Sequence, residues 1–232
     1  MMGEAAPYSL INDNLIMSLF LLNILSIGYV FLMNGSSLLE QAKNLLYYSK
    51  KTTPYNDRTH ITRICNILLY WQTLFYSSIT IFGYMQYNKP DGMNYTMAYS
   101  HLICYFLLFT VALTLKVAIS YLCNSTLFGK QAAQDWNQSF FFTIKTLGFI
   151  LFPIVVCCLL VKGFPKSYYT IYMIFATIFY LFAIITGSIK IIFAKKRNYL
   201  DIFLYLCALE LLPMTVLWRI IHESTIFLII KF

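Results

Sequence analysis

The sequence predicts an all-α, polytopic membrane protein: a bundle of six transmembrane helices with one interfacial amphipathic helix. Three observations predict this fold. Of the 232 residues, 59% are hydrophobic and 11% are charged, whereas about a quarter of the residues in a soluble chain are charged. The hydrophobic residues form runs of about 20, the length that crosses a hydrocarbon core of roughly 30 Å. The basic residues gather in alternate connections between these runs, as cytoplasmic loops do.

The six runs define the spans, and we expect residues 1–232 to form a single integral membrane domain with no separate soluble part. The spans are predicted at residues 14–33, 64–84, 98–122, 140–161, 168–193 and 199–220. The first 14 residues contain no Lys or Arg, and a secretory signal peptide needs a basic n-region. We therefore expect the first run to be a retained helix.

Residues 36–51 follow the first span and predict an amphipathic helix. Ser37 and Glu40 match a capping box, which marks the start of a helix. Apolar residues such as Ala42 and Leu45 then recur at helical spacing, with polar residues on much of the other side. This pattern is typical of a helix that lies on the membrane surface. The alternative is a docking helix for a soluble partner.

Three further features predict local packing. Asn23 and Gly28 lie in the first span, where small and polar residues usually face another helix. Residues 124–139 interrupt the apolar pattern between the third and fourth spans. The second span is rich in aromatic residues, which we interpret as packing between helices, with a lined cavity as the alternative. These residues are Tyr70, Trp71, Phe75 and Tyr76.

The distribution of charge predicts the orientation. Twelve of the 17 Lys and Arg residues fall after the odd-numbered spans or beside those connections. Because Lys and Arg accumulate on the cytoplasmic side, both termini are expected on the outer side. The formal net charge of +8 is then a consequence of topology, and we expect no binding to nucleic acid. Anionic lipids at the cytoplasmic face are a further partner that these basic clusters would suit.

The last span carries a carboxylate, Glu210, near its middle, three residues before Pro213. A charge at that depth costs roughly 3 kcal/mol on insertion scales. Asp201 lies nine residues earlier, about 13 Å along a helix axis, so the two acids cannot pair within one helix. The internal cations Lys116 and Lys145 are expected nearer the inner surface.

Three roles for Glu210 remain open. It is a proton-carrying or ion-binding group, a structural residue that is hydrogen-bonded to a neighbouring helix and protonated by burial, or the partner of a basic residue from another subunit. Intramembrane acids often mark proton and ion pathways.

Enzyme signatures are missing from the sequence. There is no H-E-x-x-H, G-x-S-x-G or Walker motif. The three histidines are scattered and lie mostly at span ends, and the six cysteines lie in or beside apolar runs without a C-x-x-C pair. We therefore expect no catalytic residue, no metal site and no cofactor.

The stretch Asp201–Pro213 (DIFLYLCALELLP) follows a Lys-rich turn. Its Y-L-C-x-L-E-x-x-P core resembles the signature of an uncharacterised family of Bacteroidota inner-membrane proteins, a domain of unknown function. The resemblance covers about Phe128–Arg219. It implies a bacterial inner membrane with the cytoplasm on the Lys-rich side and the periplasm on the other, and it carries no activity.

The sequence leaves two functions open. The first is a non-catalytic accessory or structural subunit of a larger inner-membrane assembly, with other integral membrane proteins as partners. Protein export or envelope biogenesis is suggested by association only. The alternative is a small proton-coupled transporter or channel, in which Glu210 titrates and kinks at Pro153 and Pro213 shape a path.

Overall fold

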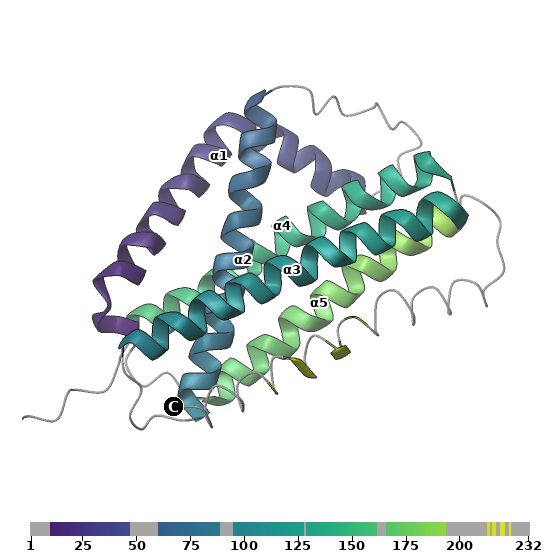
Figure 1. Cartoon of the computed structure of the whole chain (residues 1–232). Coiled ribbons are helices and arrows are strands. Elements are labelled where there is room, and N and C mark those ends of the chain that lie inside the picture. The colour runs from purple at the N-terminus through teal and green to yellow at the C-terminus, as the bar shows by residue number, and fades with distance from the viewer. Residues whose placement is uncertain are drawn as a thin grey trace, which may run out of the picture. The chain divides into compact units, whose positions relative to one another are not determined.

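The described residues of the computed structural model are 10–46, 60–88, 95–127, 129–161, 166–193 and the single positions 213, 215, 216, 219, 220 and 223. Throughout these residues the chain is helical wherever it has regular structure (Figure 1). The elements are η1 (Leu10–Asn12), α1 (Asn14–Leu46), α2 (His60–Asn88), α3 (Tyr95–Leu127), α4 (Lys130–Leu160) and α5 (Lys166–Phe193).

The chain divides into two compact units. Unit 1 comprises Met1–Phe106 and Ile144–Ala176, and unit 2 comprises Leu107–Thr143 and Thr177–Phe232. Each of the helices α3, α4 and α5 contributes residues to both units.

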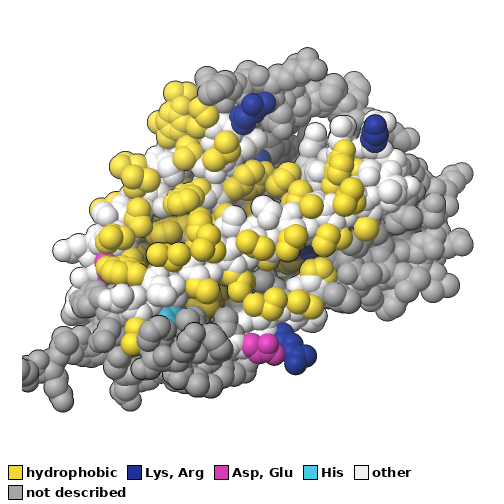
Figure 2. Space-filling view, in the orientation of Figure 1, with side chains coloured by type: hydrophobic (Ala, Val, Ile, Leu, Met, Phe, Trp, Pro, Cys, Tyr) yellow, Lys and Arg dark blue, Asp and Glu magenta, His cyan; other side chains and the backbone are white. Residues whose placement is uncertain are grey.

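Four helices in the described part of the chain are long and apolar enough to cross a membrane. The apolar segments are Asn14–Met33, Thr96–Thr126, Trp136–Leu160 and Ser167–Thr186, and each matches a predicted span. Hydrophobic side chains also spread over the face in Figure 2, where Lys, Arg, Asp and Glu occupy few places. An all-helical fold with several membrane-length helices is therefore confirmed.

The other two predicted spans differ from these four. Residues 64–84 are helical as part of α2, but α2 is not among the four membrane-length apolar helices, because polar side chains interrupt its centre. The last predicted span, 199–220, lies outside the described residues except for a few single positions. Six crossings and the outward termini therefore stay predictions.

Residues 124–139 interrupt the apolar pattern, but they are helical from 124 to 127 and from 130 to 139. α3 continues to Leu127 and α4 begins at Lys130. Gly129 joins them with a φ of 88°, in the left-handed region that glycine enters at little cost. Its carbonyl accepts a hydrogen bond from the Ala133 amide at 3.2 Å. Both helices exceed the hydrocarbon thickness, so these polar residues extend the two helices beyond the predicted spans 98–122 and 140–161.

α1 also continues beyond its predicted span. It is helical through Leu46, so the helical state of residues 36–46 is confirmed, and residues 47–51 of the predicted amphipathic helix lie outside the described part. The ribbon of α1 changes direction part-way along its length (Figure 1). The sequence Gly35-Ser36-Ser37 has the composition at which helices bend. The interfacial location stays a prediction.

Asp13 defines the start of α1. Its Oδ1 atom accepts hydrogen bonds from the amides of Leu15 at 3.0 Å and Ile16 at 3.3 Å. A side-chain acceptor at this position satisfies amides that have no intrahelical partner. Asp13 is only 3% exposed, so its acidic side chain serves the helix terminus.

α2 is a polar helix that is largely buried in unit 1. Its hydroxyl groups bond to carbonyls of its own preceding turn: Ser77 to Thr73, Ser78 to Leu74 and Thr80 to Tyr76, all within 2.8 Å. Local bonds of this kind let Ser and Thr enter an apolar interior, because each of these three hydroxyls keeps a hydrogen-bond acceptor. The buried position of α2 follows from this pattern.

Aromatic packing fixes the core of unit 1. The ring centroids of Phe20, Tyr76 and Phe152 lie 6.0 to 6.2 Å apart in every pair. Phe75 also packs against Tyr76, and Trp71 against Phe106 at 5.0 Å. The interpretation of the second span's aromatic residues as packing between helices is confirmed for Trp71 and Tyr76, whose ring partners lie on other helices.

Two glycines of unit 1 make close contacts that a larger residue would disturb. A Cβ atom at Gly83 would meet the Tyr169 hydroxyl, and one at Gly148 would meet the Thr73 side chain. Thr73 donates a hydrogen bond to the Ile144 carbonyl at 3.1 Å. Gly148 therefore lets α4 approach α2 closely enough for this bond to form.

In unit 2, Gly129 joins α3 to α4, and Lys116 of α3 lies over the Phe140 ring of α4. Trp136 and Phe140 stack with centroids 4.9 Å apart and ring planes 9° apart. Ala133 is fully buried one turn earlier. Phe140 on this face of α4 also lies against the ammonium of Lys116.

Candidate functional site

The residues predicted around the last span cannot be assembled into a site. Glu210 and Asp201 lie outside the described residues. Pro213 is described only as a half-buried residue in helical conformation. Lys116 and Lys145 are both described, and the structure places Lys145 in unit 1 and Lys116 in unit 2.

Lys145 is buried, with 5% of its side chain exposed. Its Nζ atom donates a hydrogen bond of 2.6 Å to Oδ1 of Asn66 on α2. It also lies 5.7 Å from the centroid of the Tyr70 ring, one turn further along α2. A neutral amide and an aromatic face both stabilise an ammonium group that is removed from water.

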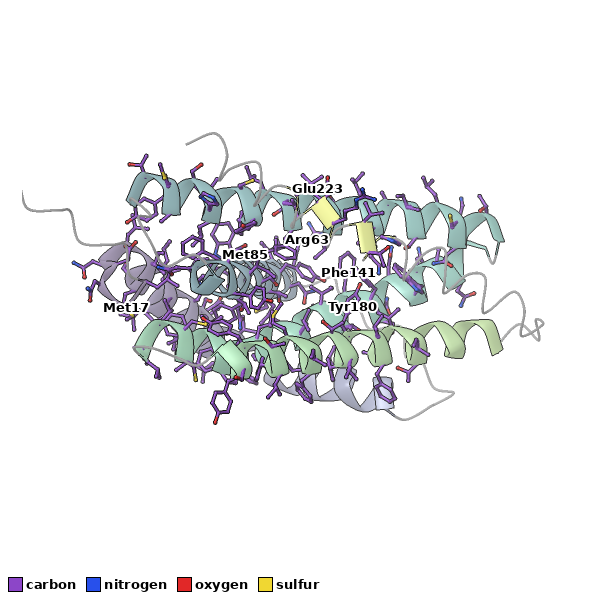
Figure 3. The ribbon with its side chains drawn as sticks, turned by 90° about the horizontal axis from the view of Figure 1, so that it is seen from below. Met17, Arg63, Met85, Phe141, Tyr180 and Glu223 are labelled. Carbon is purple, nitrogen blue, oxygen red and sulfur yellow. The ribbon has the colours of Figure 1, made fainter. Side chains whose placement is uncertain are left out.

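Lys116 lies half-buried in unit 2. It donates a hydrogen bond of 2.7 Å to the hydroxyl of Tyr180 on α5, which is labelled in Figure 3. Its Nζ atom is 5.1 Å from the Tyr180 ring centroid and 5.4 Å from that of Phe140. These two aromatic rings and this hydroxyl lie against the cation.

Unit 1 also contains a set of buried polar side chains that the sequence did not single out as a site. We call Asn23, Gln72 and Tyr76 the α1–α2 polar cluster. Their exposed fractions are 1%, 1% and 0%. Within the described structure, Oδ1 of Asn23, both amide atoms of Gln72 and the Tyr76 hydroxyl have no hydrogen-bond partner.

The register between α1 and α2 places these three residues at one level. Phe20 packs against Tyr76, while Val30 packs in a cluster with Cys65 and Leu69. Residue numbers that rise along α1 therefore meet numbers that fall along α2, and the helices are antiparallel. Asn23 lies one turn from Phe20, at the level of α2 that carries Gln72 and Tyr76. The expectation that Asn23 faces another helix is thus confirmed.

Gly28 behaves differently from this expectation. It is exposed, and a Cβ atom built on it would meet nothing within 4 Å. Gly35, seven residues later, also faces open space. Between and beside them Leu25 and Leu32 are 74% and 87% exposed. We call Leu25, Gly28, Leu32 and Gly35 the α1 outer face.

Unit 2 has buried polar groups of its own. The Ser120 hydroxyl, Nδ2 of Asn124 and Oδ1 of Asn137 have no hydrogen-bond partner among the described residues. Unit 2 therefore also buries polar groups on α3 and α4.

Groups that could carry metal chemistry do not come together in the described ranges, where no three His, Cys, Asp or Glu residues are close enough to hold an ion. The buried His101 bonds through Nδ1 to the Met97 carbonyl of its own helix at 2.6 Å. What the described residues offer is therefore neutral hydrogen bonding and two stabilised cations inside apolar helices.

The fold and these groups define an all-helical protein with several membrane-length apolar helices, in which polar and basic side chains are buried among them. The chain belongs to a family defined as a domain of unknown function (DUF4271), whose family model matches residues 16–221. No curated protein and no solved structure matches it.

Sequence reasoning named the two lysines but missed their partners. Asn66 is 79 residues from Lys145, and Tyr180 is 64 residues from Lys116. No periodic pattern links residues at such separations. The α1–α2 polar cluster left one signal in the sequence. Asn23 and Gln72 are polar residues in the middle of otherwise apolar or aromatic helical turns.

Proposed function

We propose that the protein is a non-catalytic accessory subunit of a larger inner-membrane assembly and that it contacts other integral membrane proteins through α1. The observation that supports this proposal is the α1 outer face. Its members recur at intervals of three, four and three residues, the spacing of a helix–helix seam. Two of them are the exposed leucines, and the other two are glycines at which an added Cβ atom would meet nothing within 4 Å among the described residues.

The glycines distinguish a partner helix from lipid. A glycine inside a helix costs about 1 kcal/mol relative to alanine, and a surface that faces only lipid gains nothing in return. Where two membrane helices meet, small residues allow their backbones to approach closely. Gly83 and Gly148 already serve this purpose within unit 1. Gly28 and Gly35 have no such contact in the described chain, so a helix of another protein is the occupant that explains them.

The setting of the assembly follows from the resemblance and the charge distribution. A bacterial inner membrane, six crossings and both termini in the periplasm fit the basic residues of the alternate connections. Anionic lipids would then lie against the cytoplasmic clusters. Protein export and envelope biogenesis are the kinds of assembly that we propose, by association with proteins of this kind.

Affinity purification tests this proposal. The tagged chain is isolated from its native membrane in mild detergent, and co-purifying proteins are identified and quantified by mass spectrometry. We expect recurrent stoichiometric membrane partners. Gly28→Leu fills open space, so it should leave the stability of the chain unchanged while partner recovery falls sharply.

The matched control is Leu22→Phe, which adds bulk to an exposed residue of the same helix (59% exposed). Leu22 lies about 120° around the helix from Gly28 at 3.6 residues per turn, so partner recovery should persist. Two outcomes would contradict the proposal: a monodisperse protein that functions alone, without partners, or full recovery of partners with Gly28→Leu.

A small proton-coupled transporter or channel is the second candidate, and the α1–α2 polar cluster favours it. Polar groups buried near the middle of membrane helices often line proton and ion paths. Glu210 would be the titrating group. This function predicts that Glu210→Gln abolishes proton-linked flux in proteoliposomes while the protein still folds. Unchanged flux in this variant would exclude the transporter function.

A further inference from the structure

The α1–α2 polar cluster lies far from both ends of its helices. Asn23 is at the centre of the apolar segment Asn14–Met33, about ten residues or roughly 15 Å from either end. Gln72 and Tyr76 flank the centre of α2 (His60–Asn88). Bulk water therefore does not reach these groups along the helix axes.

The cluster differs from the other polar residues of α2 in how its groups are satisfied. The buried Ser and Thr side chains donate hydrogen bonds from their hydroxyl groups to carbonyls of the preceding turn. Nδ2 of Asn23 does the same with the Leu19 carbonyl at 2.9 Å. Oδ1 of Asn23, both amide atoms of Gln72 and the Tyr76 hydroxyl have no partner in the described structure.

Leaving these atoms unbonded in a membrane interior carries a large cost. A buried amide or hydroxyl without a hydrogen bond costs about 1 to 3 kcal/mol in proteins and more in hydrocarbon. The neighbouring Phe20 and Phe152 rings offer no conventional hydrogen-bonding group. A small molecule that both donates and accepts hydrogen bonds would remove the cost.

The chemistry of the cluster selects among small ligands. Gln72 Nε2 and the Tyr76 hydroxyl can donate, while Asn23 Oδ1, Gln72 Oε1 and the hydroxyl oxygen can accept. A cation would leave the amide N–H groups unbonded, and an anion would face the two carbonyl oxygens. Exposed fractions of 0 to 1% leave access to nothing large.

We propose that the α1–α2 polar cluster is an internal water site, in which water bridges Asn23 on α1 to Gln72 and Tyr76 on α2. Water donates two hydrogen bonds and accepts two, which matches this mixed set, and buried waters typically make about three. The site gives unit 1 a hydrated polar point at mid-depth, and it does not depend on the accessory role.

Hydroxyl-radical footprinting tests the site directly. Radiolysis by a synchrotron X-ray pulse converts water into hydroxyl radicals where it lies, so residues beside internal water are oxidised even when bulk solvent cannot reach them. The full-length protein in nanodiscs is irradiated, and oxidation is quantified by mass spectrometry. We expect Tyr76 to be oxidised at least several-fold faster than Tyr105, which is equally buried in unit 1 and serves as the internal control.

The combined change Asn23→Leu and Gln72→Leu should bring oxidation of Tyr76 down to the level of Tyr105. Ser78→Ala is the matched control, because the Ser78 hydroxyl already bonds to Leu74, and it should leave oxidation of Tyr76 unchanged. Equal rates for the two tyrosines in the unmodified protein would overturn the proposal, whether or not the double variant folds. Undiminished oxidation of Tyr76 in a folded double variant would also overturn it.

Discussion

Unit 1 buries Lys145 beneath an amide and an aromatic ring, whereas unit 2 leaves Lys116 half-exposed between two rings and a hydroxyl. Both cations are carried by apolar helices. Protein groups must therefore supply the stabilisation that water gives an exposed ammonium. A buried ammonium depends on each hydrogen bond, because water cannot replace a lost partner. A half-exposed lysine can extend its charged end toward water and retain much of its hydration.

The same contrast extends to the rest of each unit. Unit 1 relies on close packing, with polar helix α2 held by local hydrogen bonds and by glycines that admit neighbouring side chains. Unit 2 relies on one turn at Gly129 and on stacked rings. We therefore expect substitutions that remove a contact to cost more in unit 1. The predictions below test that difference by the free energy of unfolding, measured by titration with a denaturing detergent and far-UV circular dichroism.

Asn66→Leu should have the largest effect. It removes the Asn66 acceptor of the Lys145 ammonium while filling a similar volume, so the buried charge loses this hydrogen bond. A hydrogen bond to a charged group is worth about 1.5 to 3 kcal/mol, and we expect a loss near the top of that range. Asn66→Asp keeps an acceptor at the same place and should remain close to the unmodified protein.

A double variant separates this bond from general damage to the helix. With Lys145→Met already present, Asn66→Leu should cost much less, because no charge remains to be left unbonded. Equal costs in the two backgrounds would show that the hydrogen bond contributes nothing to stability. The expectation that unit 1 depends more strongly on such contacts than unit 2 would then be contradicted.

Gly148→Ala should have the next largest effect. The added methyl group would press on the Thr73 side chain and disturb its bond to the Ile144 carbonyl, and such overpacking costs about 2 kcal/mol. Gly28→Ala is the control in the same unit, since its methyl group enters open space and should stabilise the helix slightly. A neutral Gly148→Ala would mean that α2 and α4 are not held closely.

Gly129→Ala tests the turn on which unit 2 depends. With φ at 88°, a Cβ atom at this position meets the backbone, and the left-handed conformation costs about 1 kcal/mol for most residues. Asn tolerates this conformation better than Ala, so Gly129→Asn should recover part of the loss. Equal stabilities for all three proteins would contradict the turn geometry.

Helix positions could be predicted from the sequence because hydropathy and length depend on local composition. The segment Asn14–Met33 was predicted at the bounds that the structure gives. The extent of α3 and α4 could not be predicted in the same way. The helical backbone continues through polar residues such as Asn124 and Gln131 when a neighbouring helix supports it. Hydropathy depends on local composition only, so it contains no information on that tertiary contact.

The candidate site could be predicted only in part, for a related physical reason. A charge in an apolar run is visible in the sequence, so Lys116 and Lys145 were identified, together with Glu210. Their partners depend on tertiary register. Nothing in the local sequence distinguishes Asn66 or Tyr180 from other polar residues, and it is the fold that places each of them beside a cation. The α1–α2 polar cluster requires the antiparallel register of two helices, which no local pattern contains.

Tyr180→Phe should have the smallest effect and gives the sharpest test of the contrast between the two lysines. It removes the hydroxyl that accepts the Lys116 hydrogen bond and keeps the ring that faces the cation. Because the half-exposed ammonium can be hydrated instead, we expect a loss of only about 0.5 kcal/mol. Tyr180→Leu removes the ring as well and should cost more, since the cation–π contact is then lost. If Tyr180→Phe cost as much as Asn66→Leu, Lys116 would be shielded from water as fully as Lys145, and both units would have to stabilise buried charge in the same way.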